Sequence, residues 1–193
     1  MVSPPFRACI DRITGADWTT GAWHHRIKRC RERIGENIMI YVAREIEVNK
    51  GLSQGEPHLT RSQVWKGLVM KAENALPFVP GMLACTVVER FEGGLVRDID
   101  FRGERAREKI TFRSEEKVTF VRLSGNADGF IVNEILGTDD DLRLKFSFAM
   151  QLLDDASGSP AERDMGDVME RDYLKAVEAT VRVIRQMVAQ GEV

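Results

Sequence analysis

Histidine and cysteine are scarce in this sequence, with three of each among 193 residues. From Met39 onward only His58 and Cys85 remain, so that part of the chain holds neither a Ser–His–Asp nor a Cys–His catalytic set. No two cysteines have the spacing of a metal site or of a disulfide framework. We therefore predict no metal and no cofactor. The odd number of cysteines and the lack of a secretion signal indicate reduced thiols and a cytoplasmic location.

The sequence also lacks a strong excess of either charge and any long apolar run. Its net charge is −2 and its pI is near 6.0, which gives no electrostatic argument for binding nucleic acid. No apolar stretch approaches the roughly 20 residues that span a bilayer, so no integral membrane contact is predicted. With 43% hydrophobic residues, the length suits one domain with a sizeable core. These features leave a homodimer open.

The first 38 residues differ from the rest of the chain. They hold seven lysines and arginines against four acids, and His24, His25 and Cys30 lie among them. Without a second cysteine at ligand spacing, a solvated basic segment is favoured over a metal site. Residues 35–39 can be encoded by a purine-rich ribosome-binding sequence ahead of an ATG codon. We therefore expect Met39 to be the biological start, residues 1–38 to be a basic leader and residues 39–193 to be the folded domain.

The end of the chain predicts one long amphipathic helix. Ser159 is placed as N-cap, Pro160 as the first helical residue and Glu162 as the third, which is a capping box. Gly191 supplies the stop signal. The spacing by threes and fours predicts one buried stripe. Its members are Met165, Met169, Tyr173, Val177, Thr180, Ile184 and Met187.

The rest of the domain predicts strands around one shorter helix. Residues 38–48 alternate as a strand, and Thr60 with Gln63 forms a capping box that opens a helix ending before Pro77. Residues 84–153 then read as six short strands joined by turns, with Gly93-Gly94 as a two-residue hairpin loop. We expect an α+β domain in which a seven-stranded curved antiparallel sheet wraps around the long C-terminal helix.

This order of elements resembles the helix-grip fold of the Bet v 1 and START-like superfamily, also called SRPBCC. More specifically, the sequence resembles the AtaL-like family from Met39 to about Gly191. The segments that carry the resemblance are AREIEVN at 43–49, LTRSQVWKGL at 59–68, FVPGM at 78–82, VERF at 88–91, VNEI at 132–135 and the helix at 173–185. The resemblance implies a cavity for a hydrophobic molecule between sheet and long helix. Some members of the superfamily are aromatase/cyclases of polyketides.

The resemblance implies that Trp65 stands beside the mouth of this cavity and that Met165, Met169 and Tyr173 roof it. Ordinary core packing is the alternative interpretation for each of these residues. The candidate ligand-binding set is Arg44, Trp65, Arg97, Ile99, Phe112, Phe120, Arg122, Phe146, Phe148, Met169 and Tyr173.

Three arginines of this set say the most about the charge of a ligand. Arg44, Arg97 and Arg122 each share the phase of the apolar, inward residues of their strands. A buried arginine is costly unless it is paired, so the three can hold a ligand carboxylate or enolate, with Glu108 and Glu134 as protein partners. In the alternative interpretation, strand ends or bulges turn these side chains to water.

The leading hypothesis is therefore a binding module for a small hydrophobic or amphipathic, and in one version acidic, molecule. The alternatives are a cyclase or dehydratase-like enzyme that uses the same cavity, and an interaction protein with a filled core. An enzyme of this kind would use Arg, Glu, Tyr or Asn for acid–base chemistry in an apolar pocket, because the residues of other catalytic sets are lacking.

Overall fold

The computed structural model describes residues 40–153 and 160–193, with the side chains of Ile40 and residues 160–174 outside the description. The sheet has the order β1-β7-β6-β5-β4-β3-β2, and all of its strand pairs are antiparallel. The elements are β1 (Ile40–Glu47), α3 (Arg61–Glu73), β2 (Met82–Phe91), β3 (Gly94–Phe101), β4 (Glu104–Arg113), β5 (Lys117–Ser124), β6 (Ala127–Leu136), β7 (Arg143–Leu152) and α4 (Pro160–Ala189).

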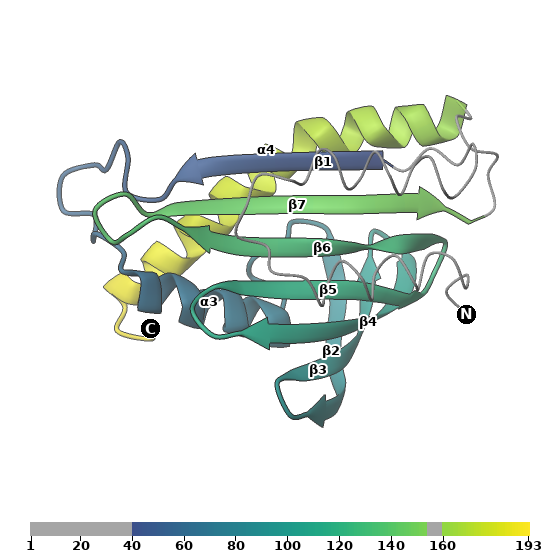
Figure 1. Cartoon of the computed structure of the whole chain (residues 1–193), viewed down its shortest axis with the longest axis horizontal. Helices are drawn as coiled ribbons and strands as arrows, with labels where there is room; N and C mark the ends of the chain where they lie inside the picture. Colours follow the sequence, from purple (N-terminus) through teal and green to yellow (C-terminus); the bar gives the residue numbers. More distant parts are fainter. Residues whose placement is uncertain (1–39, 154–159) are drawn as a thin grey trace.

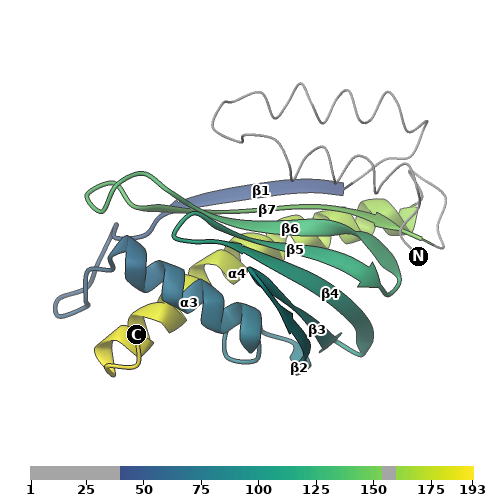
Figure 2. The ribbon, with the colours of Figure 1, turned by 60° about the horizontal axis from the view of Figure 1, so that its bottom comes forward.

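The sheet curves around the long helix (Figures 1 and 2). Strands β2 to β7 form a meander, and β1 joins its far edge beside β7, so the crossover from β1 to β2 carries α3. Helix α4 packs on β1 and β7, and α3 packs against the C-terminal part of α4 and on β5 and β6. The predicted helix-grip architecture is confirmed. None of the described helices is long and apolar enough to cross a membrane.

Both helices end as their sequence signals predict. Thr60 caps α3, and a reciprocal pair of bonds between Thr60 and Gln63 forms the capping box. The helix ends at Glu73, before the turn that contains Pro77. At the end of α4, Gly191 has φ of +76°, and the amide groups of Gly191 and Glu192 donate to the carbonyls of Val188 and Met187. This is a Schellman motif, in which glycine takes the left-handed position.

The hairpin between β2 and β3 differs from the prediction. The loop residues are Glu92 and Gly93, because Phe91 pairs with Gly94. A bulge at Val88 then shifts the register again, so that Val87 lies opposite Arg97. The predicted loop, Gly93-Gly94, would have paired Val88 with Ile99, Thr86 with Phe101 and Arg90 with Arg97, and these predicted pairs are wrong. A two-residue loop that starts one residue earlier moves every later partner by two residues, and the bulge, which inserts one residue, reverses the period-two alternation beyond it.

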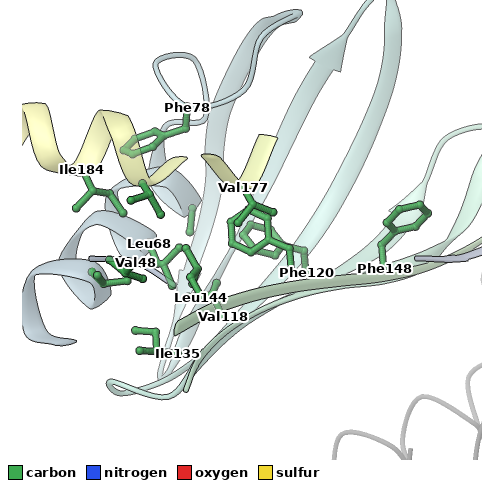
Figure 3. Close-up of a cluster of buried hydrophobic side chains, with 14 of the residues drawn as sticks. Val48, Leu68, Phe78, Val118, Phe120, Ile135, Leu144, Phe148, Val177 and Ile184 are labelled. Atoms are coloured by element: carbon green, nitrogen blue, oxygen red, sulfur yellow. The ribbon is translucent and has the colours of Figure 1, made fainter. Parts of the chain in front are cut away.

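The main core lies between the sheet and the two helices (Figure 3). Val177 and Ile184 of α4 are fully buried against a cluster that includes Leu68 of α3 and Leu144 of β7. Gly67 brings α3 close to α4, since a Cβ at this position would clash with the side chain of Ile184. Strand β6 is buried on both faces, as its apolar sequence predicts. A second cluster occupies the other face of the sheet and contains Phe130, Val132 and Ala149.

Candidate ligand-binding cavity

A cavity of about 410 Å³ lies between the concave face of the sheet, α3 and α4. Its volume is in the range of pockets that hold small organic ligands. Exposed Pro80, Arg102 and Lys175 mark the end that opens to solvent. The lining residues are Lys71, Val79, Pro80, Met82, Arg97, Ile99, Phe101, Arg102, Glu108, Phe120, Arg122, Ile131, Asn133, Phe146, Met150, Lys175 and Ala176.

Three charged side chains form a row across neighbouring strands inside this cavity. Arg97 of β3 lies opposite Glu108 of β4, and Glu108 lies opposite Arg122 of β5. Directly opposed residues share one face of a sheet, so the alternation of three strands brings them together. Arg97 bonds to Glu108 Oε2, and Nη2 of Arg122 lies 3.4 Å from Oε1. One buried carboxylate therefore serves two guanidinium groups.

Arg97 has partners on all three of its nitrogens. Its Nε and Nη2 donate to Glu108 Oε2 at 2.9 and 2.8 Å. Its Nη1 donates to the carbonyls of Lys71 and Ala72 at 3.0 and 2.9 Å, which lie in the last turn of α3 and need acceptor partners. Its guanidinium also lies 5.0 Å from the centre of the Phe120 ring. Arg97 therefore joins β3, β4 and the C-terminal end of α3. This structural role leaves it little hydrogen-bonding capacity for a ligand.

Lys71 is the second buried cation of the cavity. It lies on the inward face of α3, with 7% of its surface exposed, and its Nζ is 4.0 Å from the centre of the Phe146 ring. The pKa of Lys71 is lowered to about 7, mainly by burial and also by the charge of Arg97, while Glu108 opposes the shift. At neutral pH a large share of Lys71 is therefore an uncharged amine.

Two polar atoms at the cavity wall have no hydrogen-bond partner within the described residues. These are Nε of Arg122 and Oδ1 of Asn133, and Asn133 is only 1% exposed. A buried polar atom without a partner costs free energy, so unsatisfied groups that face a cavity point to a ligand or to water. Arg122 offers a donor and Asn133 an acceptor, and this pair can orient a ligand that carries both kinds of group.

The cavity brings together five of the predicted ligand-binding residues. They are Arg97, Ile99, Phe120, Arg122 and Phe146. The prediction that Glu108 pairs with these arginines agrees with the structure. Glu134, the second predicted partner, lies on the opposite face of β6 from Asn133, which lines the cavity, as alternation along a strand requires.

The other predicted residues do not line this cavity in the described part of the chain. Arg44 is half-buried and donates to the carbonyl of its neighbour Ala43. Trp65 and Phe112 pack edge to face, with ring centres 6.2 Å apart, and Phe148 lies in the main core. The side chains of Met169 and Tyr173 lie outside the described residues.

The predicted set missed Lys71 and Asn133, although each carried a signal. Lys71 follows Leu68 by three residues on the buried stripe of α3, and Asn133 lies between Ile131 and Ile135 on the inward face of β6. The predicted set includes arginines because they share the phase of apolar residues. The same rule, applied to α3 and β6, would have included Lys71 and Asn133. Among the described residues, no group of three or more His, Cys, Asp or Glu side chains is arranged to hold a metal ion.

The fold and the cavity together define a helix-grip domain of the SRPBCC superfamily. The chain belongs to the family described as Acetylaranotin biosynthesis cluster protein L, AtaL, whose model matches residues 46–191. The resemblance read from the sequence segments is thereby confirmed. No curated protein matches the sequence.

Solved structures with the same fold include one named as an aromatase/cyclase and one named as a di-domain ARO/CYC. The Zhui aromatase/cyclase from Streptomyces sp. R1128 has a TM-score of 0.61 and 16% identity over 81% of this chain and 100% of that one. The di-domain ARO/CYC StfQ from the steffimycin biosynthetic pathway has a TM-score of 0.60 and 11% identity over 89% of this chain and 61% of that one. Ara h 8.0201 has a TM-score of 0.52 and 14% identity over 79% and 99%. Identities this low show the shared fold alone.

Proposed function

We infer that this domain binds a small, largely hydrophobic molecule that carries an acidic or enolic group. The observation that carries the inference is the charge balance of the cavity. In the lining formed by the described residues, Glu108 is the sole carboxylate, whereas Arg97 and Arg122 are cations and Lys71 is cationic in part. Buried charges need partners, and a ligand anion would supply the missing one.

The shape and the remaining polar atoms support the same inference. The walls between the charged groups are apolar, with Ile99, Phe120 and Ile131 among them. Arg102 and Lys175 place two further cationic residues at the open end, which favours the approach of anions. An amphipathic acid would bury its apolar body against the sheet and direct its oxygens to Arg122.

A cyclase or dehydratase-like activity is the second candidate. It is favoured by the amine of Lys71 and the amide of Asn133, which are polar groups placed inside an apolar cavity. The superfamily neighbours named as aromatase/cyclases make a β-polyketone a reasonable substrate class. Incubation with a linear poly-β-ketone thioester, followed by chromatography for aromatic products, tests this candidate. An interaction protein with a filled core is the weakest alternative, because a cavity of about 410 Å³ remains.

Binding is tested first by native mass spectrometry of the full chain as purified, which detects a retained ligand. Displacement of an apolar fluorescent probe then measures binding in solution. Ile131→Trp, which fills the cavity from β6, is expected to reduce probe binding at least about tenfold. Leu123→Trp adds the same ring at an exposed position of neighbouring β5 and is the matched control. Equal probe binding by both variants would place the probe outside the cavity and contradict the proposed function.

A further inference from the structure

Lys71 differs from the other lysines of the described residues in where its amine lies. A lysine on a surface helix usually extends its ammonium group to water while its methylene groups cover apolar surface. Here α3 turns the side chain inward, and the amine lies over the face of Phe146 inside the cavity. Among the described residues its Nζ has no hydrogen-bond or ion-pair partner, because both oxygens of Glu108 lie against Arg97 and Arg122.

Burial and the charge of Arg97 disfavour protonation of the amine, whereas Glu108 favours it. Arg97 and Arg102 line the cavity from β3 and its end, Arg122 from β5 and Lys175 from α4, and the carboxylate facing them is Glu108 of β4. The lining residues from β6 and β7 are uncharged. With a pKa of about 7, roughly half of the amine is neutral at pH 7, whereas an ordinary lysine is almost fully protonated.

We propose that Lys71 is a covalent binding group of this cavity, and that its amine condenses with a ketone or aldehyde carbonyl of the bound molecule to form an imine. This proposal rests on the proposed function, since it needs a ligand in the same cavity. A desolvated lysine beside another cationic group is one of the ways in which an amine becomes a nucleophile at neutral pH.

The condensation is balanced and needs no oxidant or reductant. The nitrogen lone pair attacks the carbonyl carbon, a C–N bond forms, and one proton moves from the nitrogen to the carbonyl oxygen to give a neutral carbinolamine. Loss of that hydroxyl with a proton from nitrogen releases one water molecule and leaves a C=N bond. Asn133 lies directly opposite Phe146 on β6, and its unpartnered Oδ1 accepts a hydrogen bond from the carbinolamine hydroxyl or from the N–H group. The apolar walls limit the return of water to the imine.

An aromatic 1,3-diketone is the probe for this chemistry. With 1-phenyl-1,3-butanedione, the imine tautomerises to a conjugated enaminone whose near-ultraviolet absorbance reports the reaction in the full-length protein. Peptide mapping by mass spectrometry then locates the adduct. Lys71 is expected to react on the order of 100-fold faster than exposed Lys66 of the same helix at pH 7, with a rate that rises through pH 7 and levels off. Equal labelling of the two lysines in the wild-type protein would overturn the proposal.

Two variants separate covalent capture from simple binding. Lys71→Arg keeps a positive charge but offers no nucleophilic amine, and Lys66→Arg is the matched control on the exposed side of α3. The adduct is expected to be lost in the first variant and kept in the second. Calorimetry with 1-phenyl-1,3-butanediol, which has no carbonyl group, measures binding alone. If the diol binds and no adduct forms, the covalent role is wrong while the binding function stands. If neither compound binds, both fail.

Discussion

Arg97 donates hydrogen bonds from both Nε and Nη2 to the same oxygen of Glu108, at 2.9 and 2.8 Å, and the two side chains keep only 5% and 3% of their surface exposed. Removing one partner of such a buried pair leaves the other charge without compensation. Glu108 also faces Arg122, and Arg97 also holds the end of α3, so this pair joins the cavity wall to the fold.

Arg97→Met is therefore expected to lower the free energy of unfolding by about 3–5 kcal/mol, measured by chemical denaturation. The matched control is Arg107→Met. Arg107 pairs with Asp98 on the same two strands, but on the exposed face, where solvent screens an ion pair and its loss changes stability little. Similar losses for the two variants would contradict the structural role assigned to Arg97.

The titration of Lys71 gives a prediction on pH. Its pKa is about 7 in the folded protein against an ordinary value of 10.5, so between these values the unfolded state binds more protons. Stability therefore rises with pH across this window, and the unfavourable contribution of Lys71 is greatest below pH 7. From pH 6 to pH 9.5 the wild type should gain about 3 kcal/mol relative to Lys71→Met, as measured by denaturation at each pH. Parallel pH profiles for the two proteins would show that Lys71 titrates normally.

Much of the fold was predictable because its signals are local. The capping box of α3, the alternation of β7 and the stripe of α4 from Val177 onward each need only a few neighbouring residues, whereas the predicted cap at Ser159 lies outside the described residues. The β2–β3 register was not, because a loop that starts one residue early and a bulge at Val88 leave no clear mark in the sequence.

The candidate site was predictable in part for the same reason. Their phase in the strand alternation identified Arg97 and Arg122 as inward residues. Phase does not tell which of the two has protein hydrogen-bond partners on all of its nitrogens. That distinction depends on the end of α3 and on Glu108, which come from other parts of the chain. Arg44 also shares the inward phase and lies opposite Phe146, yet the described strand residues that line the cavity come from β2 to β7 and not from β1.

The contact between α3 and α4 predicts the effect of one methyl group. Gly67→Ala places its Cβ against the branched side chain of Ile184, which is fully buried and has little room to move. We expect a loss of about 1–3 kcal/mol in the free energy of unfolding. Ser62→Ala on the exposed side of the same helix is the control for the gain in helix propensity. A Gly67→Ala variant as stable as the wild type would show that the helices are not this close.

The position of α4 in the concave face gives a sharper test of the fold. Val177 has no exposed surface, so Val177→Asp buries an unpaired carboxylate and should cost several kcal/mol. Glu178→Ala changes the exposed neighbour and should have a small effect. Chemical denaturation of both variants measures the difference. An unchanged midpoint for Val177→Asp would mean that α4 does not cover the sheet.

The central claim, an acidic ligand oriented by Arg122, is tested most directly by calorimetry. An amphipathic aromatic carboxylate and its neutral amide are compared on the wild type and on Arg122→Met, at low and moderate salt, with Arg97 left intact because it stabilises the fold. We predict that the acid binds about tenfold or more tightly than the amide, and that Arg122→Met removes most of this preference while keeping the amide's affinity. Equal affinities for acid and amide on the wild type, or a preference that survives in Arg122→Met, would contradict the account.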